Sequence, residues 1–281
     1  MGIAARGCGA VQSQQRATQG RGRHHGIGGA DRSGKGQAMV EWMIRYAAAT
    51  AMAAGAALPA VAAGPLFKPP AGCTAYATAQ LRSCQISHHY RCAGDAPRDQ
   101  WVALLDGQGA HFLSKIDAET RWVESVDLDT GITDRIGQET DPASFSTLIQ
   151  SGRDDFDFTT VSSEGEERRF KGFDQLTGEK VTIDGVVLER TRFELTAYDA
   201  SGAEAWSRKG NQFIQRDWRI FFSDTEDFRN AAGDEVASVD TPVSFAFPGD
   251  KGFLSMTPDY DCDAVTADSG DAGSILRAAF R

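Results

Sequence analysis

The sequence predicts a mainly β protein: an antiparallel meander that forms a curved sheet, half-barrel or barrel, with one short helix near residues 142–151. Three observations support this fold class. Apolar and polar residues alternate in short segments from Trp101 onward, as they do in half-buried strands. Turn residues separate these segments at intervals of roughly 8 to 12 residues, which is typical of a meander. Glycine ends most of the turns and supplies the positive φ that they require.

The expected strands follow one another with short turns between them. They cover residues 84–92, 101–105, 111–116, 121–127, 132–136, 156–161, 167–173, 179–185, 187–198, 203–209 and 211–223. The last segment carries the clearest pattern, because Trp218, Ile220 and Phe222 share one face at a period of two. Residues 174–178 contain Asp, Thr and Gly, so we expect a turn there between two separate strands.

One helix is expected to interrupt the meander. Asp141 is a suitable N-cap, Pro142 fits the first helical position, and an apolar stripe runs through residues 145–149. Gly152 is expected to end the helix, because glycine readily adopts the left-handed conformation of a helix C-cap.

An alanine-rich apolar segment, residues 46–63, predicts export. It follows Arg45 and ends in small residues, which is the order found in a signal peptide, with cleavage near Ala63. A transmembrane helix is the weaker interpretation, because 11 of these 18 residues are alanine and Pro59 interrupts the end. We therefore expect a signal peptide over residues 43–63 and a product in the periplasm, or secreted.

The expected domain organisation follows from this cleavage. Residues 1–42 show no apolar periodicity and are expected to be disordered or a mis-assigned start. Residues 64–264 are long enough for a single β-rich domain with one sizeable core. Residues 265–281 are expected to form a linker and a short C-terminal helix.

The charge of the expected mature chain argues against some classes of partner. From Gly64 onward there are 22 Lys or Arg and 37 Asp or Glu, which gives a net charge of −15. Such an acidic chain disfavours nucleic acid and anionic lipid surfaces as partners. Acidic residues also fall on both faces of several expected strands, which argues against a membrane-embedded barrel.

Four cysteines of the expected mature chain, Cys73, Cys84, Cys92 and Cys262, predict two disulfide bonds in an oxidising compartment. If residues 84–92 form one strand, its ends lie roughly 26 Å apart, which is too far for a bridge between them. The short local loop then favours Cys73–Cys84 and leaves Cys92–Cys262, and all three connectivities remain open.

No motif commits the chain to a reaction, a metal or a cofactor. Cys84, His88, His89 and Cys92 resemble a zinc set by residue type, but on a strand His89 points away from the other three. The alternating aspartates within residues 259–263 resemble a calcium loop without the glycine and the closing glutamate of an EF-hand. We therefore assign no catalytic, cofactor-binding or metal-binding residue, and we favour a non-catalytic role.

Aromatic residues alternate along the expected strands, and most of them are expected to fill the core. The alternative is a concave apolar surface that holds a ligand or a segment of a partner. The residues that we expect to line such an apolar pocket are Phe193, Phe213, Trp218 and Phe222.

The segments QRDWRIFFS and TPVSFAFPGDKGFLS, with the late pair Asp261-Cys262, are similar to small exported proteins of Gram-negative bacteria that have no assigned function. This resemblance implies a periplasmic location and brings no activity with it. A looser likeness in architecture to periplasmic half-barrel carriers of lipoproteins concerns the fold alone.

The first functional hypothesis is therefore an exported envelope protein that binds an apolar ligand or an envelope protein segment on its curved sheet, without catalysis. The alternative is a surface interaction or assembly factor. A hydrolase, which needs acidic or histidine side chains that converge in a cleft, is the third and weakest hypothesis.

Overall fold

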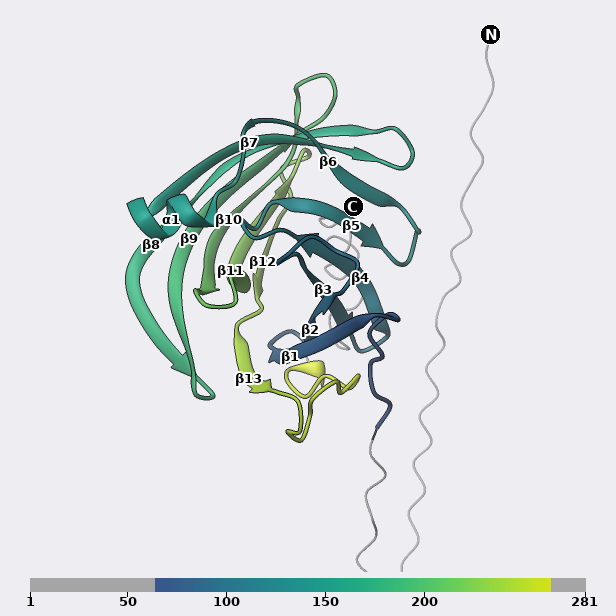
Figure 1. The fold of residues 1–281 in the computed structure, drawn as a ribbon. Coiled ribbons are helices and arrows are strands. Elements are labelled where there is room, and N and C mark those ends of the chain that lie inside the picture. The colour runs from purple at the N-terminus through teal and green to yellow at the C-terminus, as the bar shows by residue number, and fades with distance from the viewer. Residues whose placement is uncertain (1–63, 264–281) are drawn as a thin grey trace, which may run out of the picture. The chain divides into compact units, whose positions relative to one another are not determined.

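The computed structural model describes residues 64–263, which form one antiparallel sheet of thirteen strands and one short helix (Figure 1). The strands are β1 (Cys73–Leu81), β2 (Gln85–Cys92), β3 (Gln100–Asp106), β4 (Gly109–Ile116), β5 (Trp122–Asp127), β6 (Thr133–Asp141), β7 (Arg153–Ser162), β8 (Glu167–Ile183), β9 (Val186–Tyr198), β10 (Glu204–Gln215), β11 (Ile220–Asn230), β12 (Glu235–Val239) and β13 (Pro242–Ala246). The predicted leader and the predicted C-terminal helix lie outside the described residues. Within residues 64–263, no helix is long and apolar enough to span a membrane.

The sheet is a meander, as predicted. From β1 to β12, each strand pairs with the next strand of the chain, and β13 pairs with β1 on the opposite edge. The two edge strands β12 and β13 are consecutive, so the chain itself passes from one edge of the sheet to the other. The sheet is curved and not closed, because the strand order of the described residues has β12 and β13 at its two ends (Figure 1).

Contacts between distant strands show how strongly the sheet curves. The register of β2 and β3 places His89 opposite Val102, and we call the face that carries these two side chains the inward face. The His89 ring meets the Phe222 ring of β11 edge-on, with the ring centroids 5.2 Å apart. Because β2 and β11 lie far apart in the strand order, the inward face must fold back toward itself.

Two buried clusters fill much of the inward side. One joins β1 and β13 to β9, β10 and β11, and it includes Ala79, Leu188, Phe213, Phe222 and Phe245. The other lies farther along β7 to β11 and includes Phe158, Phe170, Phe193, Trp206 and Phe228. Burying side chains of this size is worth about 1.5 to 3 kcal/mol each, so the two clusters are a main source of stability.

Other apolar clusters lie on the opposite face of the sheet. In β3, the side chains of Ala103 and Leu105 point away from the inward face and pack into a third cluster. Residues 253–256 help to cover this cluster. A fourth cluster joins the helix α1 (Phe145–Ser151) to Ile214 of β10. The sheet is therefore packed on both faces over part of its area, which explains why some strands lack simple alternation.

Helix α1 begins three residues later than predicted. Asp141 remains in β6, and the N-cap is Ser144, whose hydroxyl accepts a hydrogen bond of 3.1 Å from the Thr147 N–H. The predicted end is correct: Gly152 caps the helix with φ 82° and donates its N–H to the Leu148 carbonyl.

Two predicted strand boundaries are wrong. Residues 174–178 do not form a turn, because β8 continues through them and only its register with β9 shifts between Leu176 and Lys180. Residues 211–223 are not one strand, because β10 ends at Gln215 and β11 begins at Ile220. The turn between them includes Arg219, which has a φ of 56° that turn statistics associate with glycine.

The four predicted cysteines form two disulfide bonds, but the favoured pairing is wrong. Cys73 bonds to Cys92 and Cys84 bonds to Cys262. Cys73 and Cys92 are register partners at the open end of the β1–β2 hairpin. Cys84 is not part of β2 but lies in the turn before it, with a φ of 57°, so its side chain is free to reach the C-terminal segment.

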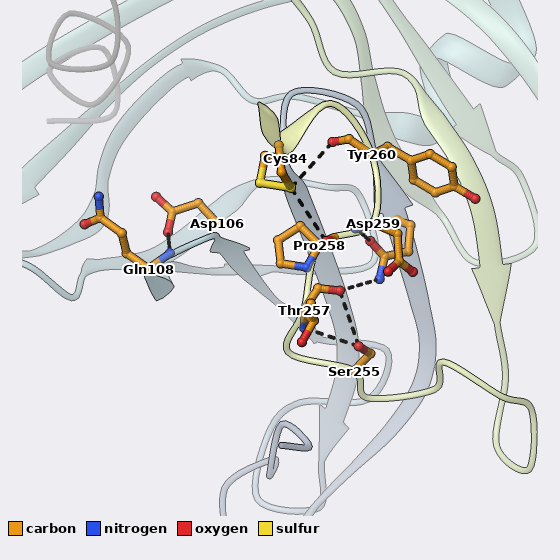
Figure 2. The surroundings of a disulfide bond; sticks show 10 residues. Cys84, Asp106, Gln108, Ser255, Thr257, Pro258, Asp259 and Tyr260 are labelled. Carbon is orange, nitrogen blue, oxygen red and sulfur yellow. Dashed lines mark hydrogen bonds between the residues drawn. A yellow bond between two sulfur atoms is a disulfide. The ribbon is translucent and has the colours of Figure 1, made fainter. Parts of the chain in front are cut away.

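The second disulfide fastens the C-terminal segment to the β1–β2 turn (Figure 2). The Cys84 N–H donates to the Tyr260 carbonyl over 2.9 Å. The Gln80 side chain donates to the Thr257 carbonyl and accepts from the Asp259 N–H. These hydrogen bonds hold the segment that covers the third cluster.

Candidate functional site

A cavity of about 230 Å³ opens on the inward face between β3 and β10. Its lining combines six apolar or aromatic side chains with six polar or charged ones, so it offers both a surface for apolar groups and partners for polar ones. The lining residues are Val102, Leu104, Phe112, Ser114, Trp122, Ser125, Asp134, Thr160, Arg168, Phe170, Trp206 and Arg208. We call this space the interior cavity.

The sheet register places one wall of the interior cavity. Val102 of β3 lies opposite Ser114 of β4, Ser114 lies opposite Ser125 of β5, and Ser125 lies opposite Asp134 of β6. Partners in register share a face, so these four side chains form a row across four strands. Two of them are serines, and small side chains at inward positions leave volume that larger residues would fill.

Aromatic rings form the other wall. The Trp122 ring meets the Phe170 ring edge-on at 5.4 Å, and the Phe170 and Trp206 rings are 5.9 Å apart. Trp206 is buried, whereas Trp122 is 39% exposed. The aromatic wall therefore runs from the core of the sheet to the solvent, which gives an apolar ligand a continuous surface to follow.

One polar group of the cavity lining lacks a partner. The Nε1–H of Trp206 is buried and makes no hydrogen bond to any described residue. A buried donor without an acceptor costs about 1 to 3 kcal/mol, and most buried tryptophan N–H groups find a partner. An oxygen or nitrogen acceptor placed next to this atom would satisfy it.

The charged groups of the lining are balanced. Arg208 donates two hydrogen bonds to the Glu226 carboxylate, of 2.6 and 2.5 Å. Arg168 pairs with Glu166 at 2.8 Å. Partial burial raises the pKa of Asp134, and the nearby Arg168 opposes this shift. The cavity therefore suits a ligand without a full charge better than an ion.

The two adjacent histidines do not form a site together. His88 is buried on the outward face, stacked on Phe67 and joined to the Thr78 hydroxyl at 2.9 Å. His89 is buried on the inward face. Burial lowers the pKa of His88 to about 4 and that of His89 to about 3, so both are neutral at pH 7. Within residues 64–263, no group of three or more His, Cys, Asp or Glu side chains has the arrangement of a metal site.

None of the four predicted pocket residues lines the interior cavity. Phe213 and Phe222 are packed within the first inward cluster, and Phe193 belongs to the second, beside Phe170 and Trp206. Trp218 lies in the β10–β11 turn. The sequence analysis missed Trp122 and Trp206 and the two serines, although each follows the period-two pattern of its own strand.

The fold and the cavity together define a class of protein: an open, curved antiparallel meander with a ligand-sized cavity on its inward face. No family model, no curated protein and no solved structure matches the chain.

Proposed function

We propose that this protein binds a small, mainly apolar ligand in the interior cavity, without catalysis, and that it does so in the cell envelope. The observation that carries the proposal is the aromatic wall of the cavity, in which the buried Nε1–H of Trp206 has no hydrogen-bond partner among the described residues. The ligand is expected to carry one hydrogen-bond acceptor for this donor.

The volume limits the size of the ligand. An apolar protein cavity of roughly 150 Å³ accommodates benzene. The interior cavity, at about 230 Å³, therefore suits one substituted ring or a short acyl chain. A large lipid would need part of its length outside, along the exposed ring of Trp122.

An envelope location is proposed from two features. The two disulfide bonds are typical of oxidising compartments. The alanine-rich segment at residues 46–63 has the order of a signal peptide, with cleavage expected near Ala63.

The proposal is tested by calorimetric titration with acetophenone and with ethylbenzene, which have similar size and differ in the carbonyl acceptor. We expect acetophenone to bind about two- to tenfold more tightly, as one net hydrogen bond allows. The preference should vanish in Trp206→Phe, and Ser125→Leu should remove binding of both by filling the cavity. Trp101→Phe is the matched control, because Trp101 packs on Tyr90 on the outward face.

Two results would overturn the proposal. One is that neither compound binds the native protein and that organic extracts of the protein from its native host contain no small molecule. The other is that Ser125→Leu, shown to be folded by circular dichroism, binds as well as the native protein does.

The alternative of a surface assembly factor rests on β12. This edge strand of five residues pairs with β11, and its Val239 side chain is 48% exposed. An edge strand offers backbone groups to another strand. If this alternative holds, the protein should self-associate or form a stable complex in analytical ultracentrifugation, and Val239→Lys should disrupt it.

A further inference from the structure

We propose a second binding site, for an oxyanion such as a carboxylate or a phosphate, in a separate cavity lined by four arginines. This cavity has a volume of about 370 Å³, and we call it the arginine cavity. Its lining residues are Arg91, Arg98, Gln100, Ala118, Arg216, Asp217, Trp218 and Arg219. The site is argued independently of the interior cavity and does not depend on the function proposed for it.

Four arginines gather at this cavity although the domain as a whole is acidic. The chain from Gly64 onward has a net charge of −15, yet four guanidinium groups border one cavity. Arg216 is held by Glu189 and Arg219 by Glu119, and Asp217 adds a third carboxylate. Four positive groups against three negative ones leave this cavity positive within an acidic molecule, so an anion is attracted there.

Two of the arginines have no carboxylate partner. Within residues 64–263, neither Arg91 nor Arg98 forms an ion pair, and both are exposed. Arg91 lies over the Tyr76 ring at 4.6 Å, which positions the guanidinium without neutralising it. Unneutralised guanidinium groups with fixed positions are well suited to bind a carboxylate or phosphate, because their N–H groups match the spacing of its oxygens.

The backbone is strained at two of these arginines. Arg98 has a φ of 75° and Arg219 a φ of 56°, a region that L residues other than Asn and Asp seldom adopt. Residues 96–99 form a turn in which the Asp99 N–H donates to the Ala96 carbonyl. Pro97 and Arg98 are its two central residues, and such a turn favours glycine at the position that Arg98 occupies. Such strain costs about 1 kcal/mol or more and is concentrated at functional sites.

Neighbouring contacts hold the two strained turns in place. Asp99 pairs with Lys115 at 3.0 Å, which ties the Arg98 turn to β4. Gln100 is buried, and its amide donates to the carbonyls of Trp218 and Arg219 over 3.0 and 2.9 Å while its oxygen accepts from Tyr76. The segment that supplies Arg216 and Arg219 is thereby fixed against β3, so the backbone that carries these two arginines is ordered before any anion binds.

The test is calorimetric titration of the native protein with inorganic phosphate, acetate and octanoate at low ionic strength. We expect at least one of them to bind, with an affinity that falls as sodium chloride is added. The double variant Arg91→Gln/Arg98→Gln should bind at least about tenfold more weakly, since each charge-assisted hydrogen bond contributes about that factor. Arg135→Gln is the matched control, because Arg135 is exposed and pairs with Glu124 outside the cavity.

The three anions distinguish the source of the bound group. If phosphate binds most tightly, the natural ligand of the arginine cavity is a phosphate or a phosphate ester. If octanoate binds more tightly than acetate, the natural ligand is an amphiphilic acid whose carboxylate head group enters the cavity. A further variant, Arg98→Gly, should raise the melting temperature by relieving the strain and still weaken anion binding. The proposal is overturned if none of the three anions binds, or if the double variant and Arg98→Gly bind as tightly as Arg135→Gln.

Discussion

Removing the two disulfide bonds separately should cost unequal amounts of stability. Cys84–Cys262 joins residues separated by 178 positions, whereas Cys73–Cys92 joins residues separated by 19. A cross-link restricts the unfolded chain, and the entropy that it removes grows with the logarithm of the loop length. The loop lengths give about 5 kcal/mol for Cys84–Cys262 and about 3 kcal/mol for Cys73–Cys92.

Packing should widen this difference. The segment that carries Cys262 also covers the third cluster through residues 253–256, so loss of its disulfide loosens apolar contacts as well. The hairpin that carries Cys73 and Cys92 is also held by its other β1–β2 register pairs, which continue on both sides of a shift between Ala75 and Ala77. Domains of this size have a total stability of roughly 5 to 15 kcal/mol, so losing Cys84–Cys262 should leave a marginal fold.

The assay is urea denaturation of two double variants, Cys84→Ala/Cys262→Ala and Cys73→Ala/Cys92→Ala, each compared with the native oxidised protein. We expect the first variant to lose at least about 2 kcal/mol more than the second. Equal losses, or a larger loss for the hairpin variant, would refute the reasoning. The reasoning would also be refuted if the intact mass of the native protein showed that all four cysteines are free thiols.

Three further predictions concern single residues. Burial, and after it the facing Asp154, raises the pKa of Asp174 to about 7. Because the folded state then binds this proton more tightly than the unfolded chain, stability should fall as pH rises from about 4 to 7. Asp174→Asn should therefore stabilise the protein at pH 8 by about 1 to 3 kcal/mol and give no gain at pH 4 in thermal melts. Ser144→Ala should cost about 1 kcal/mol in urea titrations by removing the N-cap of α1. Gly172→Ala should cost several kcal/mol of stability or prevent folding. A Cβ at Gly172 would lie 2.1 Å from a backbone oxygen of β9 and 2.9 Å from the Phe156 ring. An unchanged melting temperature would contradict this packing.

The sequence was sufficient for those features that depend on local pattern. Alternation and glycine-ended turns predicted the antiparallel meander, and Gly152 predicted the end of the helix. The failures lie where tertiary contacts override local preference. Arg219 adopts a turn conformation that glycine would normally supply, because Gln100 and Glu119 hold its segment, and no composition rule anticipates that.

The local sequence pattern could not predict the disulfide pairing or the cavity, for a related reason. Cys84 leaves the strand because its φ is positive, and this single departure exchanges the partners of all four cysteines. Ser114 and Ser125 look ordinary in sequence, and only the register of β4 and β5 places them in one wall with Asp134. Trp206 resembles any core tryptophan until the absence of an acceptor for its Nε1–H among the described residues becomes visible.

The measurement that most directly tests ligand binding in the interior cavity is a crystal structure of the protein isolated from its native host. We expect density for a small molecule between Trp122 and Trp206, with an acceptor atom within about 3 Å of Trp206 Nε1. A cavity filled by the Trp122 or Phe112 side chain, or a Trp206 N–H bonded to a protein oxygen, would show that the space is part of the packed core and would contradict the account.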